Sequence, residues 1–254
     1  MLFINNMRRG KYHIFLQARI HSTRLPGKVI IKIEGKSIIE LIIERLKKVN
    51  CVDGIFLITG PYSENRLLVE EANRLDIGYF CGCEENLLDR YYNASLKFNS
   101  ENIIRVTADC PLIDADLINK GISIFDENNN DILSVGRIKS YPHGLDFEIF
   151  NTKTLQNAWK DIFTSYADDQ KFKNSFVSVD EYMLTNNKFT CYDLTNDVDL
   201  SQIRITLDYP EDLELIRQIY HELYKKGEYF GLKKILNCIK KNPDLLNINK
   251  KQAG

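Results

Sequence analysis

The sequence lacks an excess of charge of either sign, because its 34 Lys and Arg residues nearly balance its 35 Asp and Glu residues. No overall field attracts the chain to nucleic acid or to an anionic membrane, so we expect neither as a partner. The sequence also lacks an apolar run of the roughly 18 residues that a membrane span needs, and its first residues lack a signal-peptide pattern. We therefore expect a cytoplasmic protein in which any phosphate site is a local cluster of cations.

Cysteine and histidine lack the spacing of a metal or redox motif. The six cysteines include no CxxC pair, and the CxC of Cys81 and Cys83 has no second Cys/His cluster at ligand spacing. The four histidines are scattered, so neither a metal triad nor a Ser/His/Asp triad can be assembled from spacing. Reduced, mostly buried thiols are the expectation.

Linkers rich in Gly, Pro or Ser are absent as well, and so are internal repeats, which argues against separate domains. A chain of 254 residues, 44% of them hydrophobic, is long enough to bury one core. We predict a single domain over residues 1–254, with fraying at 1–11 and 249–254.

What the sequence does contain is an alternation of short apolar runs with segments of helical period. Strands are predicted at 13–17, 54–59, 78–81, 102–107, 131–135, 145–150, 189–193 and 202–206. Helices are predicted at 37–49, 63–75, 86–97, 115–126, 153–160, 210–225 and 230–240. Strands that are apolar on both faces are typical of a covered, mostly parallel sheet. The predicted fold class is α/β, with a mixed, mostly parallel central sheet flanked by helices.

The loop after the first predicted strand carries three permanent cations, Arg19, Arg24 and Lys28, within ten residues. Ligands of open α/β sheets bind at this edge of the strands. Small and turn-forming residues let the backbone amides of the loop approach an anion, so the loop can hold a triphosphate. It is not a Walker A loop, since Val29 follows Lys28, and a solvated basic loop is the alternative interpretation.

Candidate metal ligands lie at two further junctions between strand and helix. Asp109 comes just after the strand at 102–107, where a carboxylate can hold Mg²⁺ against phosphates on the first loop. Asp208 precedes the helix that starts at Pro210 and is not needed for its first turn, so it is free to bind a metal. Asp114 is instead expected to cap the helix at 115–126.

Asp146 and Glu148 lie two residues apart in a predicted strand, so their side chains face the same side. Both could enter one cleft and, with His143 in the adjoining turn, contact the hydroxyl groups of an acceptor, or they could supply a metal ligand. A half-exposed strand is the alternative interpretation.

Five blocks of the sequence, taken in order, resemble the spore-coat polysaccharide type of cytidylyltransferase. This family is similar to the synthetases that make CMP-Kdo and CMP-sialic acid, and the resemblance covers about residues 13–248. The blocks are QARIHSTRLPGK (17–28), LLDRYY (87–92), RVTADCPLID (105–114), YPHGLDFEIF (141–150) and RITLDYPEDLELI (204–216).

The resemblance implies a GT-A-like nucleotidyltransferase fold, often found in homodimers, with Mg²⁺ as cofactor and CTP and a small acidic sugar or sugar phosphate as substrates. It assigns Asp109 to Mg²⁺ and Asp208 to a second or shared metal. It places cytosine and ribose near Cys83, Glu84 and Asp89. It assigns Arg19, Arg24 and Lys28 to the triphosphate and makes these three, with Asp109, the catalytic residues. Further nucleotide-binding residues implied in the first loop are Gln17, Ala18, Ser22 and Thr23.

Three departures from this family stand out. One is His21, which replaces a small residue common in the first loop. Residues 173–178, KNSFVS, stand where relatives usually have Arg-Glu-His-Val-Thr. Tyr209 stands where relatives have a threonine that would cap the next helix, at a cost of about 1 kcal/mol. The altered segment lies on the acceptor side, so Kdo, a nonulosonic acid and a phosphorylated polyol all stay open as acceptors.

The sequence thus predicts an Mg²⁺-dependent cytidylyltransferase that transfers CMP from CTP to the acceptor and releases pyrophosphate. One alternative is a GT-A glycosyltransferase that uses a finished nucleotide-sugar, against which the basic first loop argues. The other is a catalytically inactive nucleotide-binding partner protein, against which the retained cations and carboxylates argue.

Overall fold

The computed structural model describes residues 10–166 and 168–252, whose main feature is a seven-stranded sheet in the order β5-β4-β1-β6-β8-β7-β9. Its neighbouring strands pair in parallel, except that β8 is antiparallel to both β6 and β7. The predicted mixed, mostly parallel sheet is therefore confirmed. The strands are β1 (Tyr12–Gln17), β4 (Gly54–Thr59), β5 (Gly78–Cys81), β6 (Asn102–Thr107), β7 (Ile132–Val135), β8 (Phe147–Asn151) and β9 (Cys191–Asp193).

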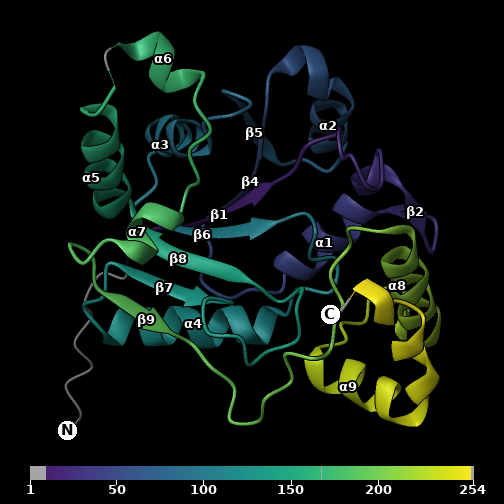
Figure 1. Ribbon diagram of the computed structural model, residues 1–254. Helices are drawn as coiled ribbons and strands as arrows, with labels where there is room; N and C mark the ends of the chain where they lie inside the picture. The colour runs from purple at the N-terminus through teal and green to yellow at the C-terminus, as the bar shows by residue number, and fades with distance from the viewer. Residues whose placement is uncertain (1–9, 167, 253–254) are drawn as a thin grey trace, which may run out of the picture.

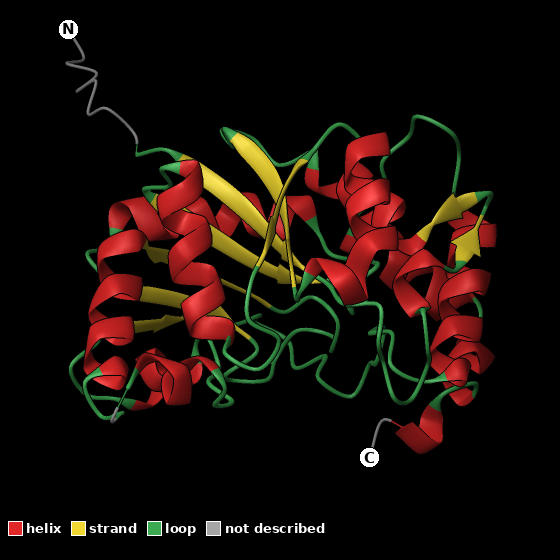
Figure 2. Cartoon of the chain, turned by 90° about the horizontal axis from the view of Figure 1, so that it is seen from above, coloured by secondary structure: helices red, strands yellow, loops and turns green. Residues whose placement is uncertain are grey.

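Helices cover both faces of the sheet (Figures 1 and 2). Figure 1 shows α3 and α5 on one side of the strands and α4 on the other. Within the described part of the chain, no helix is long and apolar enough to span a bilayer. The helices are α1 (Ile38–Leu46), α2 (Tyr62–Arg74), α3 (Leu87–Phe98), α4 (Ala115–Glu127), α5 (Thr152–Phe163), α6 (Asp169–Lys173), α7 (Glu181–Thr185), α8 (Pro210–Leu223) and α9 (Leu232–Lys241).

Strand β1 shows why the sheet has a core on each face. Tyr12, Ile14 and Leu16 pack in a cluster with residues of α1, α4 and α8, whereas Phe15 packs with residues of α3 and α5. Successive side chains of a strand point to opposite faces, so a strand that is apolar at every position needs cover on both sides. This sandwich leaves the carboxyl ends of the strands open to ligands.

The predicted strand at 202–206 is wrong. Ile203, Ile205 and Leu207 are all buried, and this alternation produced the pattern of a strand. The segment instead forms one isolated bridge between His143 and Arg204, in which the N–H of Ile205 donates to the carbonyl of His143 at 2.8 Å. Arg204 and Thr206 between them are buried too, so polarity alternates here and burial does not, and the segment packs against the end of the sheet without a ladder of hydrogen bonds.

Side-chain caps set the start of two helices, and the cap at Asp114 is the one predicted. The hydroxyl of Ser37 accepts the N–H of Glu40 at 3.2 Å at the start of α1. Asp114 caps α4 by accepting the N–H of Leu117 at 2.8 Å. The chain leading into α1 also contains a small hairpin that the sequence did not predict, made of β2 (Lys32–Ile33) and β3 (Lys36–Ser37).

Both ends of the described chain are packed further than predicted. The carbonyl of Lys11 accepts the N–H of Asn102 at 2.9 Å. Asn249 is buried, and its Nδ2 donates to the carbonyl of Arg204 at 3.1 Å and to Oδ1 of Asp212 at 2.8 Å. The predicted fraying is therefore wrong at Lys11 and Asn249, while residues 1–9 and 253–254 lie outside the described residues.

Candidate active site

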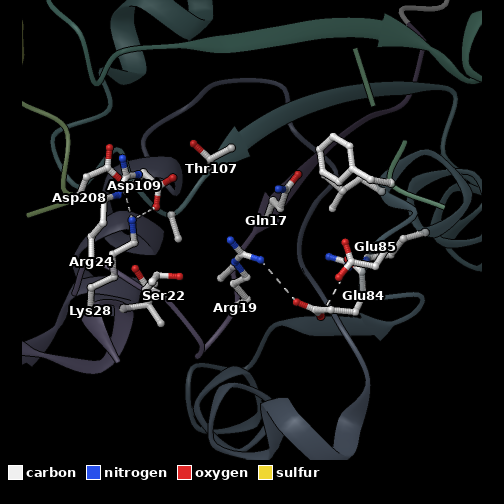
Figure 3. A pocket seen from close by; sticks show the side chains of 17 residues that line it. Gln17, Arg19, Ser22, Arg24, Lys28, Glu84, Glu85, Thr107, Asp109 and Asp208 are labelled. Atoms are coloured by element: carbon white, nitrogen blue, oxygen red, sulfur yellow. Dashed lines mark hydrogen bonds and ion pairs between the residues drawn. The ribbon is translucent and has the colours of Figure 1, made fainter. Parts of the chain in front are cut away.

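The loop after β1 lines a cavity of about 440 Å³ at the carboxyl ends of β1 and β6 (Figure 3). Its course is fixed by Gly27, whose φ of 66° suits a residue without a side chain, and by the N–H of Ile20, which donates to the buried Asn65 at 3.0 Å. The structure gathers in this cavity the seven loop residues singled out from the sequence, which are Gln17, Ala18, Arg19, Ser22, Thr23, Arg24 and Lys28.

Lys28 joins this loop to two acidic residues at one end of the cavity. Its buried ammonium contacts Oδ1 of Asp109, Oδ1 of Asp208 at 3.0 Å and the carbonyl of Leu207 at 2.7 Å. Both carboxylates therefore contact the same nitrogen atom, Nζ of Lys28. They come from distant parts of the chain, since Asp109 follows β6 and Asp208 precedes α8. The fold brings the two predicted metal ligands together.

Asp208 is held by two further cations. Nη2 of Arg24 lies 2.8 Å from its Oδ1, and Nη2 of Arg204 lies 3.3 Å from its Oδ2. Burial alone would raise the pKa of Asp208, but the hydrogen bond and charge of Lys28, followed by Arg24 and Arg204, outweigh burial and lower the pKa below its usual value. Asp208 is therefore a carboxylate at neutral pH.

The donor set of Asp109 and Asp208 fits Mg²⁺. Among residues 10–166 and 168–252, no group of three or more His, Cys, Asp or Glu side chains could hold a metal ion. Mg²⁺ is usually bound by one or two carboxylates together with substrate phosphates, and does not need an all-protein cage. The ammonium of Lys28 shows that this pair of carboxylates accommodates a positive charge.

Tyr209 supports Arg24 at this end of the cavity. The centre of the Arg24 guanidinium lies 4.9 Å from the centroid of the Tyr209 ring, and Nη1 donates to the Tyr209 hydroxyl at 3.4 Å. The N–H of Tyr209 donates to the Asp212 carboxylate at 3.0 Å at the start of α8. This is one of the two hydrogen bonds of a capping box, and it forms although no threonine is present. The residue that departs from the family pattern thus contacts a loop cation.

The other end of the cavity is formed by Glu84, Glu85, Leu87, Arg90 and Phe176. Figure 3 shows Glu84 and Glu85 on the far side of Arg19 from Asp109 and Asp208. Nη1 of Arg19 lies 3.7 Å from Oε1 of Glu84, and Nη2 of Arg90 donates to the Glu84 carbonyl at 2.7 Å. The cavity therefore has a cationic end with two carboxylates and a more mixed end.

Two residues predicted near cytosine and ribose, Cys83 and Asp89, are not among the side chains that line this cavity. Asp89 is buried at the start of α3, where it accepts from Nε1 of Trp159 at 2.9 Å and from Sγ of Cys83 at 3.5 Å. This corrects the prediction for Cys83 and Asp89. Both lie behind the lining of the cavity, because Asp89 is hydrogen-bonded to Trp159 in α5. Of the three residues, only Glu84 lines the cavity.

A second cavity of about 530 Å³ contains the predicted acceptor residues His143, Asp146 and Glu148. Burial raises the pKa of Glu148 to about 7, although the nearby Arg105 charge opposes this. Burial also raises the pKa of Asp146. The N–H of Gly144 donates to this carboxylate at 3.1 Å, which opposes the rise without cancelling it. The two acids lie in one cleft, as their spacing in the strand indicated.

Arg105 and Arg204 connect the two cavities, and sequence reasoning missed both. Arg204 lines the second cavity and contacts Asp208 of the first. Arg105 donates from Nη1 to Glu148 at 2.7 Å and from Nε to Oε1 of Gln17 at 3.3 Å. The available signal was an arginine inside an otherwise apolar strand, because such a cation needs a buried partner.

Comparison with known proteins adds to this geometry. A family model described as cytidylyltransferase matches residues 14–235. An uncharacterized protein of Methanocaldococcus jannaschii is 34% identical over 239 residues, which are 92% of each chain. The spore coat polysaccharide biosynthesis protein SpsF of Bacillus subtilis is 23% identical and covers 90% of this chain and 94% of its own.

Two further proteins extend the comparison. A 3-deoxy-manno-octulosonate cytidylyltransferase of Geotalea daltonii is 24% identical over 72% of each chain. A solved cytidylyltransferase structure from Leptospira borgpetersenii superposes with a TM-score of 0.82 at 27% identity, covering 93% of this chain and 96% of its own. The resemblance found in the five sequence blocks is confirmed, and the chain belongs to the cytidylyltransferase family.

Proposed function

We propose that this protein transfers CMP from CTP to an acidic sugar, or to a sugar or polyol phosphate, and releases pyrophosphate. The observation that carries the proposal is the meeting of three loop cations with Asp109 and Asp208 in one cavity that adjoins a second. A triphosphate is strongly anionic, so a site for it must offset charge before a second anion can approach. Arg19, Arg24 and Lys28 provide that charge.

The reaction joins an acceptor oxygen to the α-phosphorus while the bond between this phosphorus and the oxygen leading to the β-phosphate breaks. Arg24 and Lys28 offset the charge of the departing pyrophosphate, and holding both reactants in adjoining cavities orients the attack. Asp109 and Asp208 would hold Mg²⁺, which when bound neutralises phosphate charge and polarises the phosphoryl group.

Selection of cytosine is assigned to the mixed end of the first cavity. A carboxylate accepts a hydrogen bond from the 4-amino group of cytosine, whereas the oxygen of uracil at that position would be repelled. Glu84 lines this end and is partly offset by Arg19 and Arg90 at 3.7 and 3.8 Å. This arrangement favours CTP over UTP.

The second cavity is the proposed acceptor site. Asp146 and Glu148 can accept from sugar hydroxyl groups, while His143 and the exposed Lys139 can contact an acidic group. The relative named as a 3-deoxy-manno-octulosonate cytidylyltransferase supports an acidic sugar as the acceptor class.

A pyrophosphate-release assay with Mg²⁺ tests the proposal, using CTP, UTP, GTP and ATP against a panel of acidic sugars, sugar phosphates and polyol phosphates. We expect release with CTP and one acceptor class, and a loss of about 100-fold or more in Asp109→Asn. Asp197→Asn, an exposed acid outside both cavities, serves as the matched control. Preference for UTP or GTP, or turnover of finished nucleotide-sugars without pyrophosphate, would overturn the assignment.

A further inference from the structure

Phe176 is a large apolar side chain that is 70% exposed and lines the first cavity. Single exposed hydrophobic residues are common on protein surfaces and need no explanation by themselves. Phe176 differs from the others because its exposed ring faces the proposed nucleotide site. Its position also falls in residues 173–178, the segment that departs from the family pattern. That segment was expected on the acceptor side, and the structure corrects this by placing Phe176 in the first cavity.

The backbone around Phe176 is anchored to the wall of the cavity. Val177 forms a parallel bridge with Asn86, in which the N–H of Leu87 donates to the carbonyl of Val177 at 3.0 Å. Nδ2 of the fully buried Asn86 donates to the carbonyl of Phe172 at 2.7 Å. Val177 is buried, so the alternation of side chains directs Phe176 outward from a fixed segment.

The position of Phe176 along the cavity indicates which part of a nucleotide it meets. Arg24, Lys28 and Asp109 gather at the end beside β6, while Phe176 lies beside Glu85, which follows β5. The sheet order β5-β4-β1-β6 separates these ends by three strand spacings, or roughly 14 Å. A nucleotide with its phosphates at the cationic end extends its base toward Phe176.

We propose that Phe176 stacks on the cytosine ring of the bound nucleotide and covers the nucleoside end of the cavity. The inference rests on the proposed function and adds a specific contact to it. A phenyl ring offers a flat apolar face, and stacking of a base on an aromatic side chain contributes to affinity whatever the hydrogen bonds of the base. In this arrangement Glu84 selects cytosine through a hydrogen bond, and Phe176 increases the affinity for the base by stacking on it.

Calorimetric titration of CTP and of inorganic tripolyphosphate, with Mg²⁺ present, tests the contact. Phe176→Ala should raise the Kd for CTP about 10-fold and leave the Kd for tripolyphosphate unchanged, because tripolyphosphate has no base. Phe176→Trp should retain the affinity for CTP. The control is Leu96→Ala. Leu96 is also apolar and exposed, but it lies in α3 and outside both cavities, so this variant should bind both ligands like the wild type.

Thermal unfolding of each variant should give the wild-type midpoint, since the ring of Phe176 is exposed. An unchanged Kd for CTP in Phe176→Ala, or an equal loss of affinity for tripolyphosphate, would overturn the inference while the proposed function stands. Failure of the wild type to bind CTP would instead overturn the proposed function, and this inference with it.

Discussion

Nη1 of Arg105 donates a hydrogen bond to Oε2 of Glu148 at 2.7 Å, within the wall that separates the two cavities. The same guanidinium nitrogen lies 3.6 Å from Oδ1 of Asp180. One half-buried cation therefore faces two acids, and the balance of charge in the wall depends on whether Glu148 carries a proton. This relationship predicts that the stability of the protein depends on pH.

Glu148→Gln removes the titrating group and keeps an oxygen that can accept from Arg105. The pKa of Glu148 is raised from 4.5 to about 7, chiefly by burial, so the folded protein binds this proton more tightly than the unfolded chain does. The wild type should therefore lose stability relative to the variant as pH rises from 5 to 8, by roughly 2 to 3 kcal/mol. Urea unfolding at several pH values measures this difference, and parallel profiles for the two proteins would contradict it.

Asp208→Asn removes a carboxylate that contacts three cations. The folded-state pKa of Asp208 is lowered, so its contribution to stability is present above its unfolded pKa and is lost as pH falls through the folded value. We expect a loss of about 2 kcal/mol at pH 7, because the buried Lys28 loses an ionised partner. The difference from wild type should shrink below pH 4, and a constant difference across pH would count against this account. Asp197→Asn should unfold like the wild type.

Tyr209→Ala removes the ring that supports Arg24. We expect KM for CTP to rise about fivefold with a smaller change in kcat, because Arg24 keeps its charge and loses its position. Tyr209→Phe retains the ring and should stay near wild type, since the hydroxyl contact is a long one of 3.4 Å. Steady-state kinetics separate these cases, and equal KM values for Tyr209→Ala and the wild type would show that the ring does not position Arg24.

Gly144→Ala should destabilise the protein by about 3 kcal/mol. Gly144 has a φ of 112°, and an added Cβ would lie 2.6 Å from the backbone N of Thr206, so the bridge between His143 and Arg204 must shift. Gly227 is the matched control, with a φ of 85° and nothing within 4 Å of an added Cβ. Gly227→Ala should cost about 1 kcal/mol, and equal losses in chemical denaturation would contradict the argument.

Much of the fold could be predicted because local pattern and final position agree. The strands β1, β4 and β6 carry apolar residues on both faces, so their pattern alone indicates a covered sheet. The loop cations follow β1 directly, and the rule that ligands bind at the carboxyl edge of strands placed them correctly.

What could not be predicted depends on contacts between distant segments. The sequence does not show that Asp89 pairs with Trp159, 70 positions away, so a residue behind the cavity was assigned to its lining. The carbonyl of Arg204 accepts from Asn249, and this contact packs a segment whose polar composition indicated fraying. At 202–206 the apolar residues alternate because the extended segment packs against the sheet. A paired strand has the same pattern, so the sequence does not distinguish the two.

The chain has a single tryptophan, Trp159, so its intrinsic fluorescence comes from one known place in the structure. The indole of Trp159 stacks on Phe163 with ring centroids 4.8 Å apart and meets the ring of Phe172 edge-on at 5.7 Å. Phe172 lies in α6, four residues before Phe176, so a nucleotide that contacts Phe176 should change the surroundings of the indole. Intrinsic fluorescence should therefore report the proposed binding of a nucleotide in the unmodified protein, without a label and in real time.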